Sequence, residues 1–488
     1  MDNRLSLPGT SPTTGPPAPR RGLRWLRRVL VAALAGGVVA GAVLVALPED
    51  RQRPEVVRPP AAGPQAHVPA AVTFGVPAAL PQLTAFIGQQ ERRVREQPQD
   101  ARAWAALGSA YVERGRTAAD AADYPKAQQA LQTSLRVRGT RNTEALDGLA
   151  ALALARRDFP AAKQYAEQAL KATPKRWAAY PPMIDAYDGL GDYEAAHKTL
   201  DKLLELHSGA VARPAVMARA SAVYRDRGWR EDAVAQLTDA AAGARTPAEQ
   251  AAYLTGLGQL AFERGDLKDA LRHFEAAARL EPGRRAALVG RGRTLAALGR
   301  TPEALAAYRT ALARQPSPQD TLELGELYES LGQSRAAAAQ YEQLKTRVRQ
   351  SVAGGVDEEL LIGQFEADHG DPWEAVERLE EEWRRQPGTE VADALGWALH
   401  RTGEDEEALT YASAATDKTK GGGVRSALYA FHRGMIELEL ELAGPARRHL
   451  QEALRINPYF SPLRAPVARA ALQGLGEVPD EPLPGDAP

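Results

Sequence analysis

The sequence contains one local cluster of residues that could carry out chemistry, Asp368-His369-Gly370-Asp371. A histidine beside carboxylates can bind a divalent metal ion or transfer a proton. The same residue types are also typical of a polar turn between two helices. The eight histidines are otherwise scattered, and none lies at metal-ligand spacing from another. We therefore expect a polar turn at this position, with no metal site and no cofactor.

The sequence also lacks the motifs of the common enzyme classes. It contains no GxxxxGK[ST], GxSxG or HExxH pattern, and no GxGxxG that follows a strand. The chain has no cysteine, which excludes disulfides, thiolate metal ligands and thiol nucleophiles. These absences predict a protein that is not an enzyme.

Charge is distributed unevenly along the chain. Residues 1–48 carry six Arg and one Asp, a formal charge of +5, so the other 440 residues carry −6 of the total of −1. Binding to nucleic acid requires a basic face on the folded part of a protein. The mildly acidic body therefore argues against a nucleic-acid partner.

The N-terminal region has the pattern of a membrane anchor. We interpret residues 1–28 as a disordered basic segment and residues 29–47 as a transmembrane helix. The latter are nineteen uncharged residues, ten of them Val or Leu, and span roughly 28 Å as a helix. Five Arg precede this run and three follow it. The positive-inside rule then predicts a cytoplasmic N-terminus and an extracytoplasmic body.

A cleaved secretory signal is the alternative interpretation of the same region. Ala40-Gly41-Ala42 fits the small-x-small cleavage pattern, so the body would be secreted after cleavage near Ala42. In both interpretations residues 48–81, with eight prolines, form a semi-extended linker outside the membrane.

From about residue 82 the sequence predicts successive helices with a period near 34 residues. The best-preserved unit spans residues 251–284. Its first helix carries Leu254, Leu257, Gly258 and Ala261, Gly265-Asp266 forms the turn, and its second helix carries Ala270, Phe274 and Ala277. Ten such units cover residues 101–460 and start near Ala101, Thr143, Trp177, Pro214, Ala251, Arg285, Pro318, Val356, Thr389 and Ala427.

The small residues of this repeat have a steric reason. One position of the second helix is alanine in all ten units, from Ala127 to Ala446, and one position of the first helix is glycine in seven. Two helices approach closely only where side chains are nearly absent at the crossing. The pattern resembles the tetratricopeptide-repeat (TPR) family, and with one anchor it is similar to membrane-tethered TPR proteins of actinobacterial type. The expected fold is an all-α solenoid of about ten helix pairs.

Capping helices are expected at both ends of such a stack. Residues 82–100 are amphipathic through Leu83, Phe86, Ile87 and Val94, and are expected to cover the first unit. Residues 461–476 offer Leu463, Val467 and Leu472 to cover the last one. The acidic, Pro-rich residues 477–488 are predicted to be disordered.

The resemblance implies that the first helix of each unit lines a concave groove in which a protein or peptide partner lies. Transferred to this chain, the groove positions of the family are Glu144, Asp147, Asp185, Asp188, Arg225, Gln259, Phe262, Arg293, Glu326, Glu329, Gln364, Asp393, Trp397, His400, Phe431 and Met435. The chaperone-tail clamp of some TPR domains needs Asn and Lys in the groove. The body contains only Asn142 and Asn457, and neither falls at a groove position, which disfavours that specialty.

Two groups of these residues suggest binding. The four carboxylates from Glu144 to Asp188 could hold a basic segment, or form a solvated acidic face. Trp397, Phe431 and Met435 could form an apolar anchor pocket, or pack the last units together. We predict a non-catalytic scaffold that is tethered to the membrane and grips an extended partner segment. The alternative is an accessory subunit of a membrane transport or envelope enzyme complex.

Overall fold

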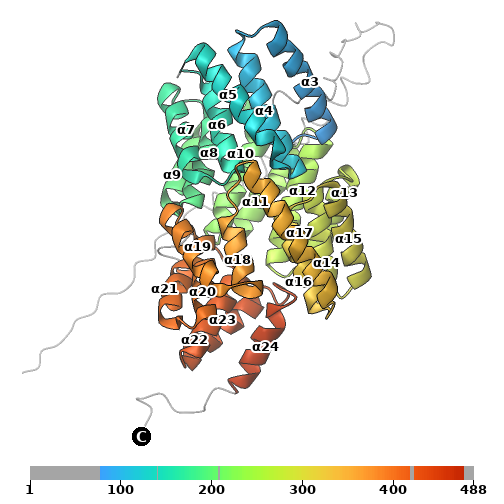
Figure 1. Cartoon of the computed structure of the whole chain (residues 1–488), viewed down its shortest axis with the longest axis vertical. Coiled ribbons are helices and arrows are strands. Elements are labelled where there is room, and N and C mark those ends of the chain that lie inside the picture. The colour runs from blue at the N-terminus through green and yellow to red at the C-terminus, as the bar shows by residue number, and fades with distance from the viewer. Residues whose placement is uncertain (1–76, 140, 207–208, 418–422, 477–488) are drawn as a thin grey trace, which may run out of the picture. The chain divides into compact units, whose positions relative to one another are not determined.

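The computed structural model describes residues 77–139, 141–206, 209–417 and 423–476, which belong to one compact unit of the chain. These residues form α-helices and two short 3-10 helices and contain no β-strand. Figure 1 shows the helices following one another from α3 in blue to α24 in red. The prediction of an all-α solenoid is confirmed for this part of the chain.

Ten helix pairs follow the first helix. The first members of the pairs are α4 (Ala101–Ala118), α6 (Thr143–Ala155), α8 (Tyr180–Gly189), α10 (Gly209–Asp226), α12 (Pro247–Glu263), α14 (Arg285–Ala297), α16 (Pro318–Ser330), α18 (Glu359–His369), α20 (Thr389–Thr402) and α22 (Ala427–Glu439). The 3-10 helix η3 (Trp177–Ala179) precedes α8.

The second members of the pairs are α5 (Tyr124–Arg138), α7 (Phe159–Ala172), α9 (Tyr193–Glu205), α11 (Arg230–Gly243), α13 (Leu267–Leu280), α15 (Thr301–Arg314), α17 (Ser334–Ala353), α19 (Pro372–Arg385), α21 (Asp405–Thr416) and α23 (Ala443–Ile456). The 3-10 helix η2 (Ala121–Asp123) lies in the turn of the first pair.

Close helix crossings explain the small residues of the repeat. Nine of the ten alanines at the small position of the second helix have no exposed surface, and Ala337 is 3% exposed. A Cβ atom added to Gly258 would lie 2.7 Å from the ring of Phe274, and one added to Gly290 of the next pair 2.3 Å from the same ring. A single buried phenylalanine therefore joins two neighbouring pairs, and only glycine gives it room.

The turn within a pair usually contains a glycine with positive φ, as at Gly191, Gly228 and Gly265. The second pair has Arg157 at this place, and the tenth has Glu441. Both residues keep the left-handed backbone, with φ of 61° and 59°. The turn geometry is therefore retained where the sequence departs from the repeat, at a local cost of about 1–2 kcal/mol per residue.

Turns of the early pairs also contact connections that lie five pairs later. The turn of the second pair meets the connection after the seventh, where Asp357 N donates to the carbonyl oxygen of Arg156 at 2.9 Å. In the third pair, Tyr193 OH accepts from Thr389 N at 3.0 Å, after the eighth pair. In the fourth, Arg230 donates to the carbonyl oxygen of Arg425 at 2.7 Å, after the ninth. The array therefore contacts itself at a regular stagger of five pairs.

The two terminal helices are fixed to different extents. The first, α3 (Leu80–Glu96), buries the large side chains Leu83, Ile87 and Val94. The last, α24 (Arg464–Gly474), buries only two alanines, Ala465 and Ala468. The expectation that Val467 covers the last pair was wrong, because its side chain is 45% exposed. The connection before α24 sets the rotation of this helix, and it turns the alanines inward.

Among the described helices, none combines the length and hydropathy needed to cross a bilayer. The segment predicted to be transmembrane, residues 29–47, lies outside the described residues. The same holds for the basic segment 1–28, most of the linker 48–81 and the tail 477–488.

Candidate partner-binding cleft

A cleft of about 690 Å³ lies between the first helices of the middle pairs and the last part of the chain. One wall comes from α10, α12, α14, α15 and α16, with Glu390 of α20. The other comes from residues 424–428 and 457–469. We call this space the central cleft. Its lining includes Arg225, Gln259, Phe262, Glu263, Arg293, Tyr308, Gln319, Glu323, Glu326, Leu331, Glu390, Arg425, Asn457, Tyr459, Phe460 and Arg464.

Arginines on one wall of the cleft pair with carboxylates on the first helix of the next pair. Arg225 of α10 binds Glu263 of α12 at 2.8 Å, and Arg293 of α14 binds Glu323 of α16 at 2.7 Å. Burial acts to raise the pKa of Glu263, but the charge of Arg225 together with hydrogen bonds from Arg225 and Gln259 lowers it. The arginines of this wall are thus matched by carboxylates of the chain itself.

Phe262 contacts one of these paired arginines through its ring. The guanidinium of Arg293 lies over its ring at 5.5 Å from the centroid, within the range of a cation–π interaction. Gln259 Oε1 accepts from Arg293 at 2.9 Å. The three predicted groove residues Arg225, Phe262 and Arg293 therefore lie together in the lining of one cleft. Phe262 is itself 5% exposed, so it supports the wall more than it offers a free surface.

The four acidic groove residues do not form a free acidic face. Glu144 pairs with Arg138 at 3.4 Å, and Asp147 pairs with Arg176 at 2.6 Å. Asp185 binds Arg219 of the next pair. Of the four, Asp188 alone forms no ion pair with another described residue. Three of the four charges that the sequence offered for a basic segment are therefore already used within the array.

Asp188 is the exception, and its surroundings oppose ionisation. Burial, with added repulsion from Asp226 and Asp185, raises its pKa to about 8. Burial likewise raises the pKa of Asp226 to about 6, although Arg225 opposes this. Both carboxylic acids are therefore protonated in the folded protein at pH values where they would be ionised in the unfolded chain.

This raised pKa predicts a stability that falls with pH. The contribution of neutral Asp188 is complete below pH 4, near the ordinary value, and is lost as pH rises towards 8. Since one pKa unit corresponds to about 1.4 kcal/mol and the side chain retains some exposure, we expect Asp188→Asn to raise the free energy of unfolding at pH 8 by about 2 kcal/mol. Urea denaturation at pH 4 and pH 8 measures this. An equal effect at both pH values contradicts it.

The aromatic group near the end of the array is more buried than a free anchor pocket would be. Trp397 lies 5.8 Å from Phe431 and stacks on His432 at 4.2 Å. Phe431 is 1% exposed and contacts Phe460 at 5.6 Å between ring centroids. Met435 packs at the edge of the same cluster. In this structure the group packs the tenth pair against the end of the chain.

His400 lies beside this aromatic cluster and is bound within its own helix pair. Its Nδ1 is paired with Asp405, at the start of the second helix of its own pair. It also contacts the ring of Trp397 at 5.0 Å between centroids. The structure therefore gives this predicted groove residue a partner within the chain.

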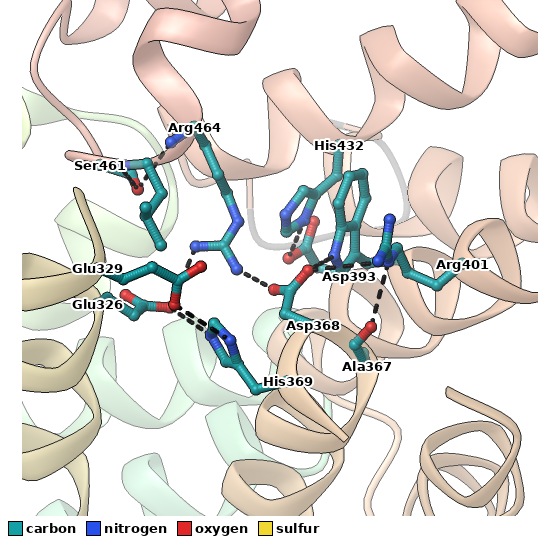
Figure 2. Close-up of polar contacts among 12 residues, drawn as sticks. Glu326, Glu329, Ala367, Asp368, His369, Asp393, Arg401, His432, Ser461 and Arg464 are labelled. Carbon is teal, nitrogen blue, oxygen red and sulfur yellow. Dashed lines mark hydrogen bonds and ion pairs between the residues drawn. The ribbon is translucent and has the colours of Figure 1, made fainter. Parts of the chain in front are cut away.

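Asp368 and His369 belong to a network of polar and charged residues (Figure 2). Asp368 accepts from Trp397 Nε1 at 3.0 Å, and His369 lies 3.4 Å from Glu329. Asp371 accepts from Trp373 N at the start of α19, at 2.9 Å. Among the described residues, no group of three His, Cys, Asp or Glu side chains is placed to hold a metal ion.

The sequence missed one central residue of this network, Arg464. Figure 2 shows its guanidinium between Glu326 of α16 and Asp368 of α18. The distance to Glu326 is 3.3 Å. Burial opposes the charge of Arg464, but the two carboxylates outweigh it and raise its pKa. Only the pattern of a charged residue at the start of a capping helix could have indicated this role.

Asn457 also lies where the sequence did not place it. It was assigned to no groove position, yet its side chain lines the cleft and its Nδ2 donates to the carbonyl oxygen of Phe262 at 2.8 Å. The repeat pattern places only the first helices in the groove. The pattern contains no sign that residues 457–469 pack against those helices.

Comparisons with known proteins agree with the repeat. The tetratricopeptide-repeat family model matches residues 255–321, which run from α12 to α16 and include two of the best-preserved units. Among curated proteins, no sequence matches this chain.

Several solved structures are similar to parts of the chain. A human IFIT1 dimer with PPP-AAAA is 17% identical and has a TM-score of 0.42, with 64% of this chain and 72% of that chain covered. PilF from Pseudomonas aeruginosa is 19% identical, with a TM-score of 0.34 over 43% of this chain and 93% of its own. A tetratricopeptide-repeat protein from Parabacteroides merdae is 18% identical, with a TM-score of 0.32 over 54% and 99%.

Proposed function

We propose that this protein is a non-catalytic scaffold that binds an extended segment of a partner protein in the central cleft. The observation that supports this most directly is the cleft itself, which combines paired charges, aromatic rings and about 690 Å³ of open space. Repeat arrays present such long surfaces to extended chains. A peptide offers backbone groups, charged side chains and apolar side chains together, as this lining requires.

Charge pairing favours a peptide over a nucleic acid. Phosphate backbones are bound by arginines and lysines whose charge is free to displace counterions. In the cleft Arg225 and Arg293 are bound by Glu263 and Glu323, and Arg464 by Glu326 and Asp368. Such a surface can bind positively and negatively charged side chains, but it has little unpaired positive charge to bind a polyanion.

The proposal includes the tether that the sequence predicts. Residues 29–47 anchor the chain in the membrane, and the Pro-rich residues 48–81 hold the array away from it on the outer face. The tether limits the search for a partner to a shell near the membrane, which favours partners that are themselves membrane proteins or secreted segments.

Cross-linking in intact cells tests this function. A photo-cross-linking amino acid at Leu331, which lines the cleft, is expected to capture a partner segment. The matched control is the same residue at Leu280 on α13, outside the cleft lining. Both leucines are 37% exposed, so a nonspecific surface reaction affects them equally. Equal capture at the two positions, or capture at neither, contradicts the proposal.

The nature of the captured protein separates the two forms of the proposal. Several partners that share a segment type indicate a general scaffold. One dominant membrane protein that also co-purifies stably indicates an accessory subunit of a transport or envelope complex.

A further inference from the structure

The last described residues of the array form one wall of the central cleft and pack against the helices of the opposite wall. We call residues 457–475 the C-terminal strap. Asn457 is bound to the backbone of Phe262, and Pro458 packs on Gly265, where an added Cβ would lie 3.1 Å from its Cδ. The ring of Phe460 covers Phe431. The strap therefore contacts the concave helices through polar backbone contacts and an aromatic side chain.

Arg464 fastens the strap to two different repeats. Its guanidinium bridges Glu326 of the seventh pair and Asp368 of the eighth. The three side chains are only 16%, 18% and 14% exposed. Trp397 fixes the position of Asp368 through its indole N–H. This pocket for a guanidinium is built by three separate helices, α16, α18 and α20.

The apolar contacts of the strap come mainly from partly buried side chains, since Phe460, Leu472 and Leu475 pack against the cluster that contains Phe431 and Leu450. The helix within it buries two alanines and leaves Val467 45% exposed. Tyr459 is 42% exposed. At the other end of the array, α3 buries three large aliphatic side chains. The strap is therefore attached both by these apolar contacts and by the ion pairs of Arg464 with Glu326 and Asp368.

We propose that the C-terminal strap is an internal ligand of the central cleft, and that the partner segment which displaces it carries an arginine, preceded by an aromatic residue, that replaces Arg464 between Glu326 and Asp368. This rests on the proposed function, since it names the chemistry of the segment that the cleft binds.

The requirement for arginine follows from the two buried carboxylates. When the strap leaves, Glu326 and Asp368 lose their shared cation, and an unpaired charge in a poorly solvated site is costly. His369 lies 3.9 Å from Glu326, and Arg401 lies 4.0 Å from Asp368, so each carboxylate keeps a more distant basic neighbour but the cation that joins them is lost. A planar guanidinium donates in two directions to acceptors on separate helices, which a lysine ammonium does less well.

Displacement of the strap would also expose the aromatic group that the sequence singled out. Phe431 is covered by Phe460 of the strap, and both belong to one cluster with Trp397 and Met435 at its edge. An aromatic residue of the partner, placed before its arginine as Phe460 precedes Arg464, fits the same surface. The anchor-pocket and packing interpretations thus describe this aromatic group without and with the strap in place.

The test uses the full chain and a fluorescent peptide that comprises residues 455–470. We expect Arg464→Ala to accelerate amide exchange in residues 459–475 and to increase peptide affinity, each by about tenfold or more, because a larger fraction of the protein is open. Arg455→Ala is the matched control, since this arginine lies on α23 with its side chain 72% exposed and should change neither quantity. A thermal melt confirms that the array remains folded.

A groove-side variant and an altered peptide make the test specific. Asp368→Asn should also accelerate exchange in the strap, but it should not increase peptide affinity, because the pocket itself is damaged. A peptide with alanine in place of its arginine should not bind the Arg464→Ala protein more tightly than it binds the unaltered protein. Unchanged exchange in Arg464→Ala, or equal binding of the two peptides, would overturn the proposal.

These outcomes are distinguishable from failure of the proposed function. Tight peptide binding by Arg464→Ala with no cellular cross-link from Leu331 would support the strap and refute the scaffold. A specific cross-link from Leu331 with no effect of Arg464→Ala would support the scaffold and refute the strap.

Discussion

Replacing Phe274 by alanine is expected to lower the free energy of unfolding by about 3–5 kcal/mol. The side chain is 1% exposed and lies against Gly258 of its own pair and Gly290 of the next. Its removal leaves a cavity between two backbones that cannot collapse without moving both pairs. Urea denaturation followed by circular dichroism at 222 nm measures the loss.

A control on the same helix separates this packing effect from a general loss of helix stability. Leu280, at the end of α13, is 37% exposed, so Leu280→Ala should cost about 0.5 kcal/mol or less. If Phe274→Ala costs no more than this control, the phenylalanine does not join the two pairs.

Replacing Gly191 by alanine is expected to open the contact between the third pair and the connection after the eighth. Its φ is +72°, and a Cβ would lie 2.3 Å from the carbonyl oxygen of Pro387. Gly299 has nearly the same φ, +75°, with nothing within 4 Å. Both variants carry the left-handed strain of about 1–2 kcal/mol, and Gly191→Ala adds about 1–3 kcal/mol from overpacking.

Hydrogen exchange at Thr389 reports on this contact directly, because its amide donates to Tyr193 OH across the junction. The amide should exchange faster in Gly191→Ala than in Gly299→Ala. Both variants should have a lower free energy of unfolding because of the strained turn. Equal exchange in the two variants would show that the junction tolerates the extra atom and that the stagger is loosely held.

The pairing of helices was predictable because it depends on neighbours in sequence. Ala270 and Gly258 lie twelve residues apart, and their sizes alone set how closely two helices of a pair approach. The turn between the two helices is equally local, and at Arg157 the backbone keeps its left-handed geometry without the glycine. The rotation of α24 was not predictable, because Val467 and Ala468 are equally compatible with a helix and only the preceding connection decides between them.

The site was predictable only in part for a related reason. Arg225 and Phe262 occupy the twelfth position of successive units and Arg293 the ninth position of the next. Both are groove positions of the first helix, so the period brings the three residues to one wall of the cleft. Asn457 reaches Phe262 from 195 residues further along the chain. The sequence records no signal for such an encounter, because the stagger accumulates from small rotations between pairs. The ion-pair partners of Asp147 and Asp185 were missed since arginines near a groove look alike in the sequence.

The five-pair stagger also has a consequence for how this molecule folds. In an open repeat array each unit is stabilised by its two neighbours, so the ends fray and unfolding proceeds piecewise along a line. Hydrogen bonds such as Asp357 to Arg156 and Thr389 to Tyr193 tie early units to late ones. Loss of either end then weakens the middle, which makes unfolding more cooperative. The same bonds raise the contact order and slow the final step of folding, so the N-terminal half of the array stays incompletely stabilised until the last pairs have been synthesised.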